Sequence, residues 1–144
     1  MPNETSSALG TFILRVSLGV IYLAHGLYLK LFVFTLPGTA QFFESIGLPG
    51  PLAYLVFAAE TAGGAALIVG FLTRWTALAL VPVALGATWA HLGSGWLFTN
   101  AGGGWEYPLF LAVATFAQSL LGDGAYAVSR ATASFAVPAR AGRA

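Results

Sequence analysis

The sequence contains no cysteine and has few charged residues. Asp, Glu, Lys and Arg make up 8% of the 144 residues, whereas about a quarter is usual in soluble domains. So few charges cannot cover a surface that faces water, and 58% of the residues are hydrophobic. The outer surface is therefore expected to face lipid. The lack of cysteine excludes a disulfide framework, a thiol redox centre and a thiolate metal site, so redox chemistry would need a bound cofactor or a partner.

Basic charge is also scarce, and this argues against nucleic acid as a partner. The formal net charge is +1 and the sequence has no basic run. Residues 1–10 contain no Lys or Arg, so they do not form the charged start of a signal peptide. The length fits one domain. We therefore expect the first apolar segment to stay in the protein as a transmembrane helix.

Four apolar segments are expected to cross the membrane, each close to the roughly 20 residues that a spanning helix needs. They cover about residues 9–34, 51–72, 74–92 and 107–121, and segments rich in Gly and Pro separate most of them. The predicted fold class is an all-α membrane protein, a four-transmembrane-helix bundle over residues 1–126. Residues 127–144 form an Arg- and Ala-rich tail that we expect to be cytoplasmic and partly disordered.

The arginines predict the orientation. Lys30 is the one candidate basic residue for the outer side, and the rest fall on the other side: Arg15, Arg74, Arg130, Arg140 and Arg143. The positive-inside rule then places both termini in the cytoplasm. In the first outer loop, residues 39–46 (TAQFFESI) put their apolar side chains on one helical face. This pattern predicts a short amphipathic helix, and an ordinary connecting turn is the alternative.

Ionisable residues lie inside the predicted spans, where a charge at mid-membrane costs at least a few kcal/mol. Glu60 lies near the middle of the second span, and most of the others lie in the outer half of the bundle. We therefore predict a polar pocket there. The candidate catalytic residues are Glu60 and His25. The candidate ligand-binding residues are Lys30, His91, Glu106, Tyr107, Arg15 and Gly26.

Structural roles are the alternative for each candidate. At 100° per residue His25 and Lys30 lie about 140° apart, so both reach one cavity only if it is broad or Lys30 bends. Lys30 could instead extend to the membrane interface, and Glu60 could serve only as a structural partner of Lys30 or a histidine. His91 and Glu106 could be solvated at the interface. For Arg15, a cytoplasmic anchor or a partner of Asp123 is the alternative, and His25 could be an interhelical hydrogen-bonding group.

The order and spacing of these residues resemble the DoxX family of small four-helix bacterial membrane proteins, over about Leu14 to Tyr126. The segments that carry the resemblance are RVSLGVIYLAHGLYLKL, IGLPGP, AAETAGGAALIVGFLTR, His91, GGGWEYPL and GDGAY. The resemblance implies a multi-pass protein of the bacterial cytoplasmic (inner) membrane with both termini inside. It also implies a link to quinone chemistry, because the family takes its name from a subunit linked to thiosulfate:quinone oxidoreductase. All eight candidates match the family's recurrent polar positions.

Three functions remain open at this point. The first is a quinone-interacting subunit of a membrane oxidoreductase or stress-response complex. There His25, Lys30 and His91 would donate hydrogen bonds, Glu60 or Glu106 would exchange protons, and a redox partner protein would supply electrons. The second is a metal or haem site built from the two His and two Glu, with the metal unknown. The third is non-enzymatic: a scaffold or assembly subunit, or a small proton-coupled transporter that works as a homo-oligomer.

Overall fold

The computed structural model describes residues 3–129, which are helical with no strand among them. Helix α1 (Glu4–Leu23) continues without a break into a π-helix, η1 (Ala24–Val33). The chain then forms α2 (Leu36–Ser45), α3 (Leu52–Val69) and α4 (Thr73–His91), a 3₁₀ turn η2 (Leu92–Ser94), and α5 (Glu106–Leu121). The predicted all-α class is therefore confirmed, and the predicted loop helix corresponds to α2.

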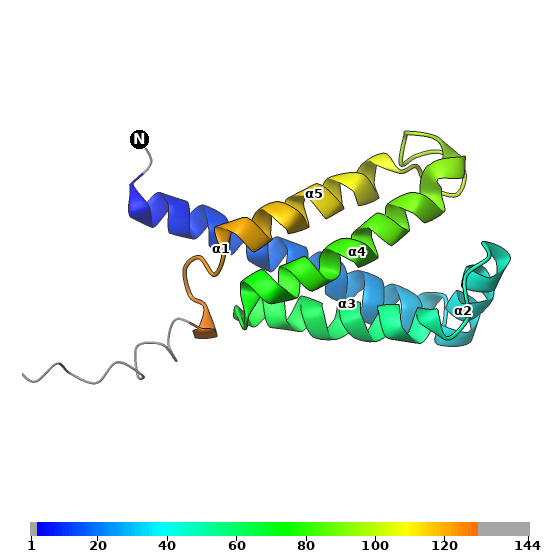
Figure 1. Cartoon of the computed structure of the whole chain (residues 1–144), viewed down its shortest axis with the longest axis horizontal. Helices are drawn as coiled ribbons and strands as arrows, with labels where there is room; N and C mark the ends of the chain where they lie inside the picture. The colour runs from blue at the N-terminus through cyan, green and yellow to red at the C-terminus, as the bar shows by residue number, and fades with distance from the viewer. Residues whose placement is uncertain (1–2, 130–144) are drawn as a thin grey trace, which may run out of the picture.

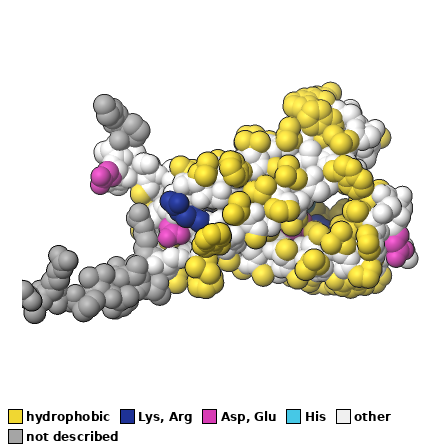
Figure 2. Space-filling model, viewed as in Figure 1, with side chains coloured by type: hydrophobic (Ala, Val, Ile, Leu, Met, Phe, Trp, Pro, Cys, Tyr) yellow, Lys and Arg dark blue, Asp and Glu magenta, His cyan; other side chains and the backbone are white. Residues whose placement is uncertain are grey.

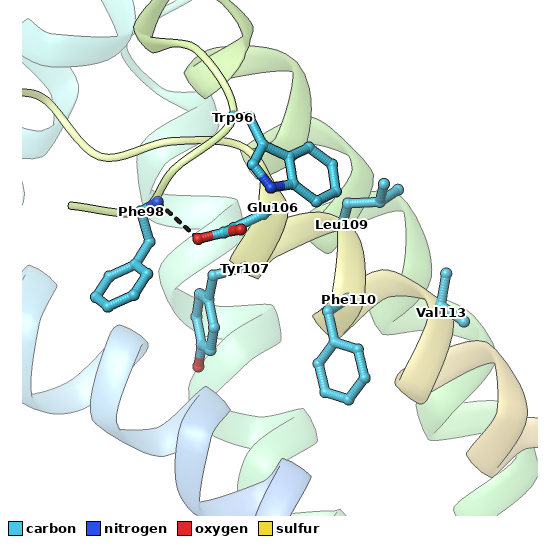
Figure 3. A pocket seen from close by; sticks show the side chains of 7 residues that line it. All are labelled: Trp96, Phe98, Glu106, Tyr107, Leu109, Phe110 and Val113. Atoms are coloured by element: carbon cyan, nitrogen blue, oxygen red, sulfur yellow. Dashed lines mark hydrogen bonds between the residues drawn. The ribbon is translucent and has the colours of Figure 1, made fainter. Parts of the chain in front are cut away.

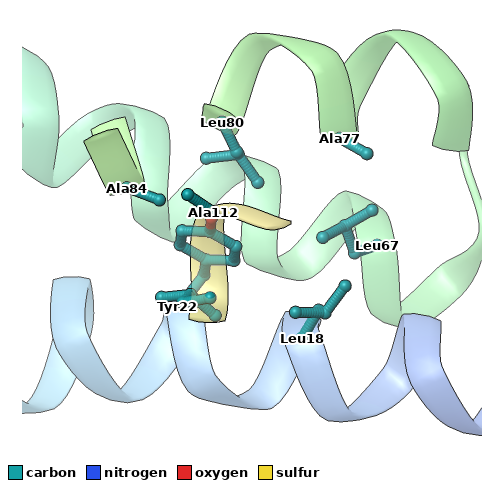
Figure 4. Packing of buried hydrophobic residues seen from close by; sticks show 8 residues of the cluster. Leu18, Tyr22, Leu67, Ala77, Leu80, Ala84 and Ala112 are labelled. Atoms are coloured by element: carbon teal, nitrogen blue, oxygen red, sulfur yellow. The ribbon is translucent and has the colours of Figure 1, made fainter. Parts of the chain in front are cut away.

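The helices form two pairs that spread apart at one end. Helix α1 with η1 packs along α3, and α4 packs along α5. The pairs meet at the end that holds the α3–α4 turn, and they diverge towards the end that carries α2 and the loop before α5 (Figure 1). A buried apolar cluster joins the pairs, with side chains from α1, α3, α4 and α5 (Figure 4). Its members are Leu18, Tyr22, Leu67, Ala77, Leu80, Ala84, Leu111 and Ala112.

Small residues bring α1 and α3 into backbone contact. A Cβ atom added at Gly19 would lie 2.8 Å from the carbonyl oxygen of Gly64, and a Cβ at Gly64 would lie 2.8 Å from that of Gly19. Close packing of this kind is typical of membrane helices, because lipid supplies no hydrophobic force between them. The α1–α3 pair therefore holds the site residues of these two helices at fixed separation.

Three helical segments among the described residues are long and apolar enough to cross a membrane: Glu4–Val33, Leu52–Val69 and Thr73–Ser94. Helix α5 has 16 residues and is shorter than these three, although it starts and ends where the fourth span was predicted. Of the predicted tail, residues 130–144 lie outside the described part of the chain. Before them, Ala127 is buried, and Ser129 donates from its backbone nitrogen to Gly70, 3.2 Å away.

Candidate functional site

An ion pair between η1 and α3 forms the centre of the predicted pocket. The Nζ atom of Lys30 lies 2.6 Å from Oε2 of Glu60, and Glu60 is only 6% exposed. A carboxylate at this depth has little access to water, so its charge is balanced by the ammonium group. Lys30 therefore turns into the protein and does not extend along the surface.

The π-helix explains how Lys30 reaches Glu60. Its hydrogen bonds join residues five apart, as in the 2.8 Å bond from the backbone nitrogen of Phe34 to the carbonyl of Leu29. Such a helix makes roughly 4.4 residues per turn, so His25 and Lys30 lie about 50° apart. The 140° separation predicted for an α-helix was wrong, because the local geometry changes at Ala24.

Gly26 allows η1 to approach α3 at this point. A Cβ atom at Gly26 would lie 2.7 Å from Oγ1 of Thr61 and 3.0 Å from Cβ of Glu60. Both distances are shorter than normal contacts, so only glycine fits without a shift of the helices. Gly26 thus positions the ion pair through backbone proximity, since it has no side chain to touch a ligand.

His25 and Tyr107 meet across the gap between the helix pairs. Their rings are stacked with centroids 6.3 Å apart and planes 21° apart. Nδ1 of His25 lies 2.9 Å from the carbonyl oxygen of Ile21. A carbonyl can only accept, so Nδ1 carries the proton and Nε2 is the acceptor of the neutral ring.

A second polar contact, which sequence reasoning missed, lies in the core beside this group. The hydroxyl of Tyr22 and Oγ1 of Thr115 are 2.9 Å apart, and both residues are buried. Tyr22 lies four residues before Gly26, which packs against Glu60. The sequence did offer a signal for Tyr22, because Arg15, Tyr22 and Gly26 fall on one face of the first predicted helix. Thr115 gave none, because a lone threonine is common in membrane helices.

His91 and Glu106 do not join the ion pair. His91 donates from Nδ1 to the carbonyl of Ala87 in its own helix, 2.8 Å away. Oε1 of Glu106 accepts from the backbone nitrogen of Phe98 at 2.9 Å (Figure 3), and its own backbone nitrogen donates to Trp96 at 3.1 Å. Glu106 therefore fastens the loop that precedes α5.

Arg15 lies far from the ion pair, at the end of the bundle that holds the α3–α4 turn. It is fully buried, and its two terminal nitrogens donate to four backbone carbonyls. These belong to Leu67 and Ile68 at the end of α3, and to Ala125 and Tyr126. A cation at a helix C-terminus also balances the helix dipole. This geometry supports the anchoring role for Arg15.

An open apolar cavity of about 530 Å³ lies against α5 and the loop before it, and Tyr107 connects it to His25. The lining residues are Trp96, Phe98, Glu106, Tyr107, Leu109, Phe110 and Val113. In Figure 3 the rings of Tyr107 and Phe110 extend from α5 towards the ribbon of α1. The space-filling view shows a hollow between the helix pairs towards the end that carries α2, with basic and acidic side chains inside it (Figure 2). The arrangement can hold a flat apolar molecule that carries polar atoms on one edge.

The donor atoms expected for a metal do not gather. Residues 3–129 contain no group of three or more His, Cys, Asp or Glu side chains that could hold a metal ion. His91 and Glu106 make separate local contacts, and His25 faces Tyr107. The geometry of these residues therefore gives the metal hypothesis no support.

Comparison with known proteins identifies the family. The DoxX family model matches residues 10–93. The chain belongs to the DoxX family. It is 40% identical over 82 residues to "Putative oxidoreductase CatD" of Bacillus subtilis (strain 168), a match that covers 57% of this chain and 59% of CatD. It is 51% identical over 41 residues to "Inner membrane protein YqjF" of Escherichia coli (strain K12), covering 28% of this chain and 32% of YqjF.

These relatives agree with the membrane location. The apolar helices and the family place the chain among bacterial inner membrane proteins. The matched part of the chain spans less than two thirds of the length of each relative. No solved structure matches the chain.

Proposed function

We propose that this DoxX protein binds a quinone in the outer half of the bundle, as the quinone-interacting subunit of a membrane oxidoreductase. The observation that carries the proposal is the buried Lys30–Glu60 ion pair beside the stacked His25 and Tyr107. Charged residues inside a membrane are energetically costly, and they commonly mark functional sites. Tyr107, which stacks on His25, also lines an apolar cavity, where the ring of a quinone head group would lie.

Each part of a quinone has a matching group in this arrangement. Carbonyl oxygens accept hydrogen bonds, which Lys30 and the hydroxyl of Tyr107 can donate. The aromatic ring would lie against Tyr107 and Phe110, which line the cavity. Reduction to the quinol adds two protons to the oxygens, and Glu60 or Nε2 of His25 would exchange them.

Electrons would come from a partner protein. The sequence offers no haem motif or flavin site of its own, and the name of CatD describes an oxidoreductase. In this proposal the DoxX chain binds and protonates the quinone, while the partner holds the electron-donating group.

We further propose that α5 is a fourth span, which completes the four-helix bundle with both termini in the cytoplasm. Its 16 residues extend about 24 Å, and it packs against α4, which is long enough to cross the membrane. A helix packed along a spanning helix lies at the same depth. Its outward side chains away from the cavity are apolar, including Phe116, Leu120 and Leu121.

Mass spectrometry of co-purifying small molecules tests the quinone proposal. Wild-type protein isolated in mild detergent should retain a quinone, and Glu60→Gln should retain much less. Glu4→Gln is the matched control, because Glu4 is an exposed acid at the start of α1 and its loss should leave quinone retention unchanged.

A folding defect must be separated from loss of binding. The double variant Lys30→Met/Glu60→Leu removes both charges together and should keep the fold, yet it should also lose the quinone. If the wild type carries only ordinary lipids, or if the double variant keeps the quinone, the proposal is wrong.

A further inference from the structure

Buried polar groups continue from the candidate site along the interior towards the end of the bundle that holds the α3–α4 turn. Tyr22 lies four residues before Gly26, which packs against Glu60, and its hydroxyl bonds to Thr115 at 2.9 Å. Gln118 lies three residues beyond Thr115, on the same face of α5. Tyr22, Thr115 and Gln118 are all almost completely buried. A membrane-protein core rarely holds such a row without a use for it.

Three buried polar atoms in this row have no hydrogen-bond partner among residues 3–129. They are Nε of Arg15, Oγ1 of Thr73 and Oε1 of Gln118. A fourth such atom, Oγ1 of Thr61, lies near the ion pair and is not part of the row. Buried polar atoms are normally satisfied by protein or by ordered water. These three are chemically complementary, because Nε of Arg15 donates, Oε1 of Gln118 accepts and a threonine hydroxyl does both.

The same three side chains belong to segments that touch one another. Arg15 lies against Gly70, at the start of the α3–α4 turn that leads to Thr73. Gly122 accepts a 2.7 Å hydrogen bond from Nε2 of Gln118, and a Cβ atom at Gly122 would lie 2.9 Å from Nε of Arg74. The neighbours of Thr73 and Gln118 are therefore in contact at this end of the bundle.

We propose that these groups form a proton path through the bundle, in which ordered water bound by Arg15, Thr73 and Gln118 connects the end with the α3–α4 turn to Thr115, Tyr22 and Glu60. Beyond Glu60 the path continues to its ion-pair partner Lys30. This activity goes beyond quinone binding, because it needs only the protein's own groups and water.

The transfer conserves protons at every step. Each hydroxyl or water accepts one proton on one side and releases another on the other side, so no group changes its net protonation. Glu60 is the exception, since its carboxylate takes up a proton and then releases it while Lys30 stays charged. The hydroxyl of Tyr22 has no substitute in this row, because Leu18 and Leu67 beside it are apolar.

Proton entry into liposomes tests the path without any quinone. Purified protein is reconstituted with a trapped pH-sensitive dye, and a potassium diffusion potential made with valinomycin drives proton entry. Wild-type vesicles should acidify faster than protein-free vesicles. Tyr22→Phe keeps the ring in the core and removes the hydroxyl, so it should lower the protein-dependent rate about ten-fold.

Tyr28→Phe is the matched control, because Tyr28 is a tyrosine of η1 that is exposed on the surface. It should conduct as the wild type does. Thr115→Val should reproduce the loss, and melting curves of all variants report whether they fold. Equal rates for wild-type and protein-free vesicles, or for Tyr22→Phe and the wild type, would show that no such path exists. Quinone retention is measured separately, so either proposal can fail alone.

Discussion

At the residue scale, the structure separates the ionisable side chains by the partners that they find. Glu60 has a charged partner, Lys30, whereas the two terminal nitrogens of Arg15 donate to backbone carbonyls from segments far away in the sequence. The position of each residue along its predicted span was enough to place Glu60, His25, Lys30 and Tyr107 at a similar depth in the membrane. The carbonyl partners of Arg15 could not be predicted, because every residue of a sequence offers a carbonyl and only the fold decides which are free.

The ion pair leads to a prediction about stability. Glu60→Gln and Lys30→Met should each lower the free energy of unfolding by about 3 kcal/mol, because each leaves one buried charge without a partner. Lys30→Met/Glu60→Leu should be near the wild type, since apolar side chains of similar size need no partner. Thermal unfolding in detergent, followed by circular dichroism, measures this. Additive losses in the double variant would show that the two residues are not energetically coupled.

At the element scale, the change from α-helix to π-helix at Ala24 decides what the site contains. The length of the apolar run predicted a helix across residues 9–34, and a helix is present. It did not predict the extra residue per hydrogen-bonded turn, because apolar residues surround the polar ones on every side and leave no clear period to count. The angle between His25 and Lys30 was therefore wrong, although both residues were correctly placed on the first helix.

Gly26 provides the prediction at this scale. Gly26→Ala should lower stability by about 1–3 kcal/mol and weaken quinone retention, because the added Cβ atom would push η1 away from Thr61 and Glu60. The matched control is Gly86→Ala in the interior of α4, where a Cβ atom meets nothing within 4 Å. That control should be stabilised by about 0.5–1 kcal/mol from helix propensity alone. A Gly26→Ala protein as stable as the control would mean that close approach at Gly26 does not hold the pair together.

At the scale of the whole molecule, composition and hydropathy predicted the class of protein well, because an excess of apolar residues has few physical explanations other than lipid. The number of membrane spans follows less directly from composition and hydropathy. Helix α5 is shorter than a typical span, and its place in the bundle depends on its packing along α4. The sequence also could not show that the two helix pairs diverge, since this shape depends on how Tyr107 meets His25 of the first helix.

The proposed topology can be measured directly because the chain has no cysteine. Single cysteines are introduced at exposed positions: Gln41 on α2, Thr99 in the loop before α5, and Glu4 and Tyr126 near the opposite end. If α5 is a fourth span and the termini are cytoplasmic, a membrane-impermeant maleimide applied to spheroplasts labels Gln41→Cys and Thr99→Cys. Glu4→Cys and Tyr126→Cys react only after the membrane is permeabilised. Labelling of Tyr126→Cys from outside would place α5 on the surface and leave three spans, with the candidate site open on one side to the periplasm and not enclosed in the bundle.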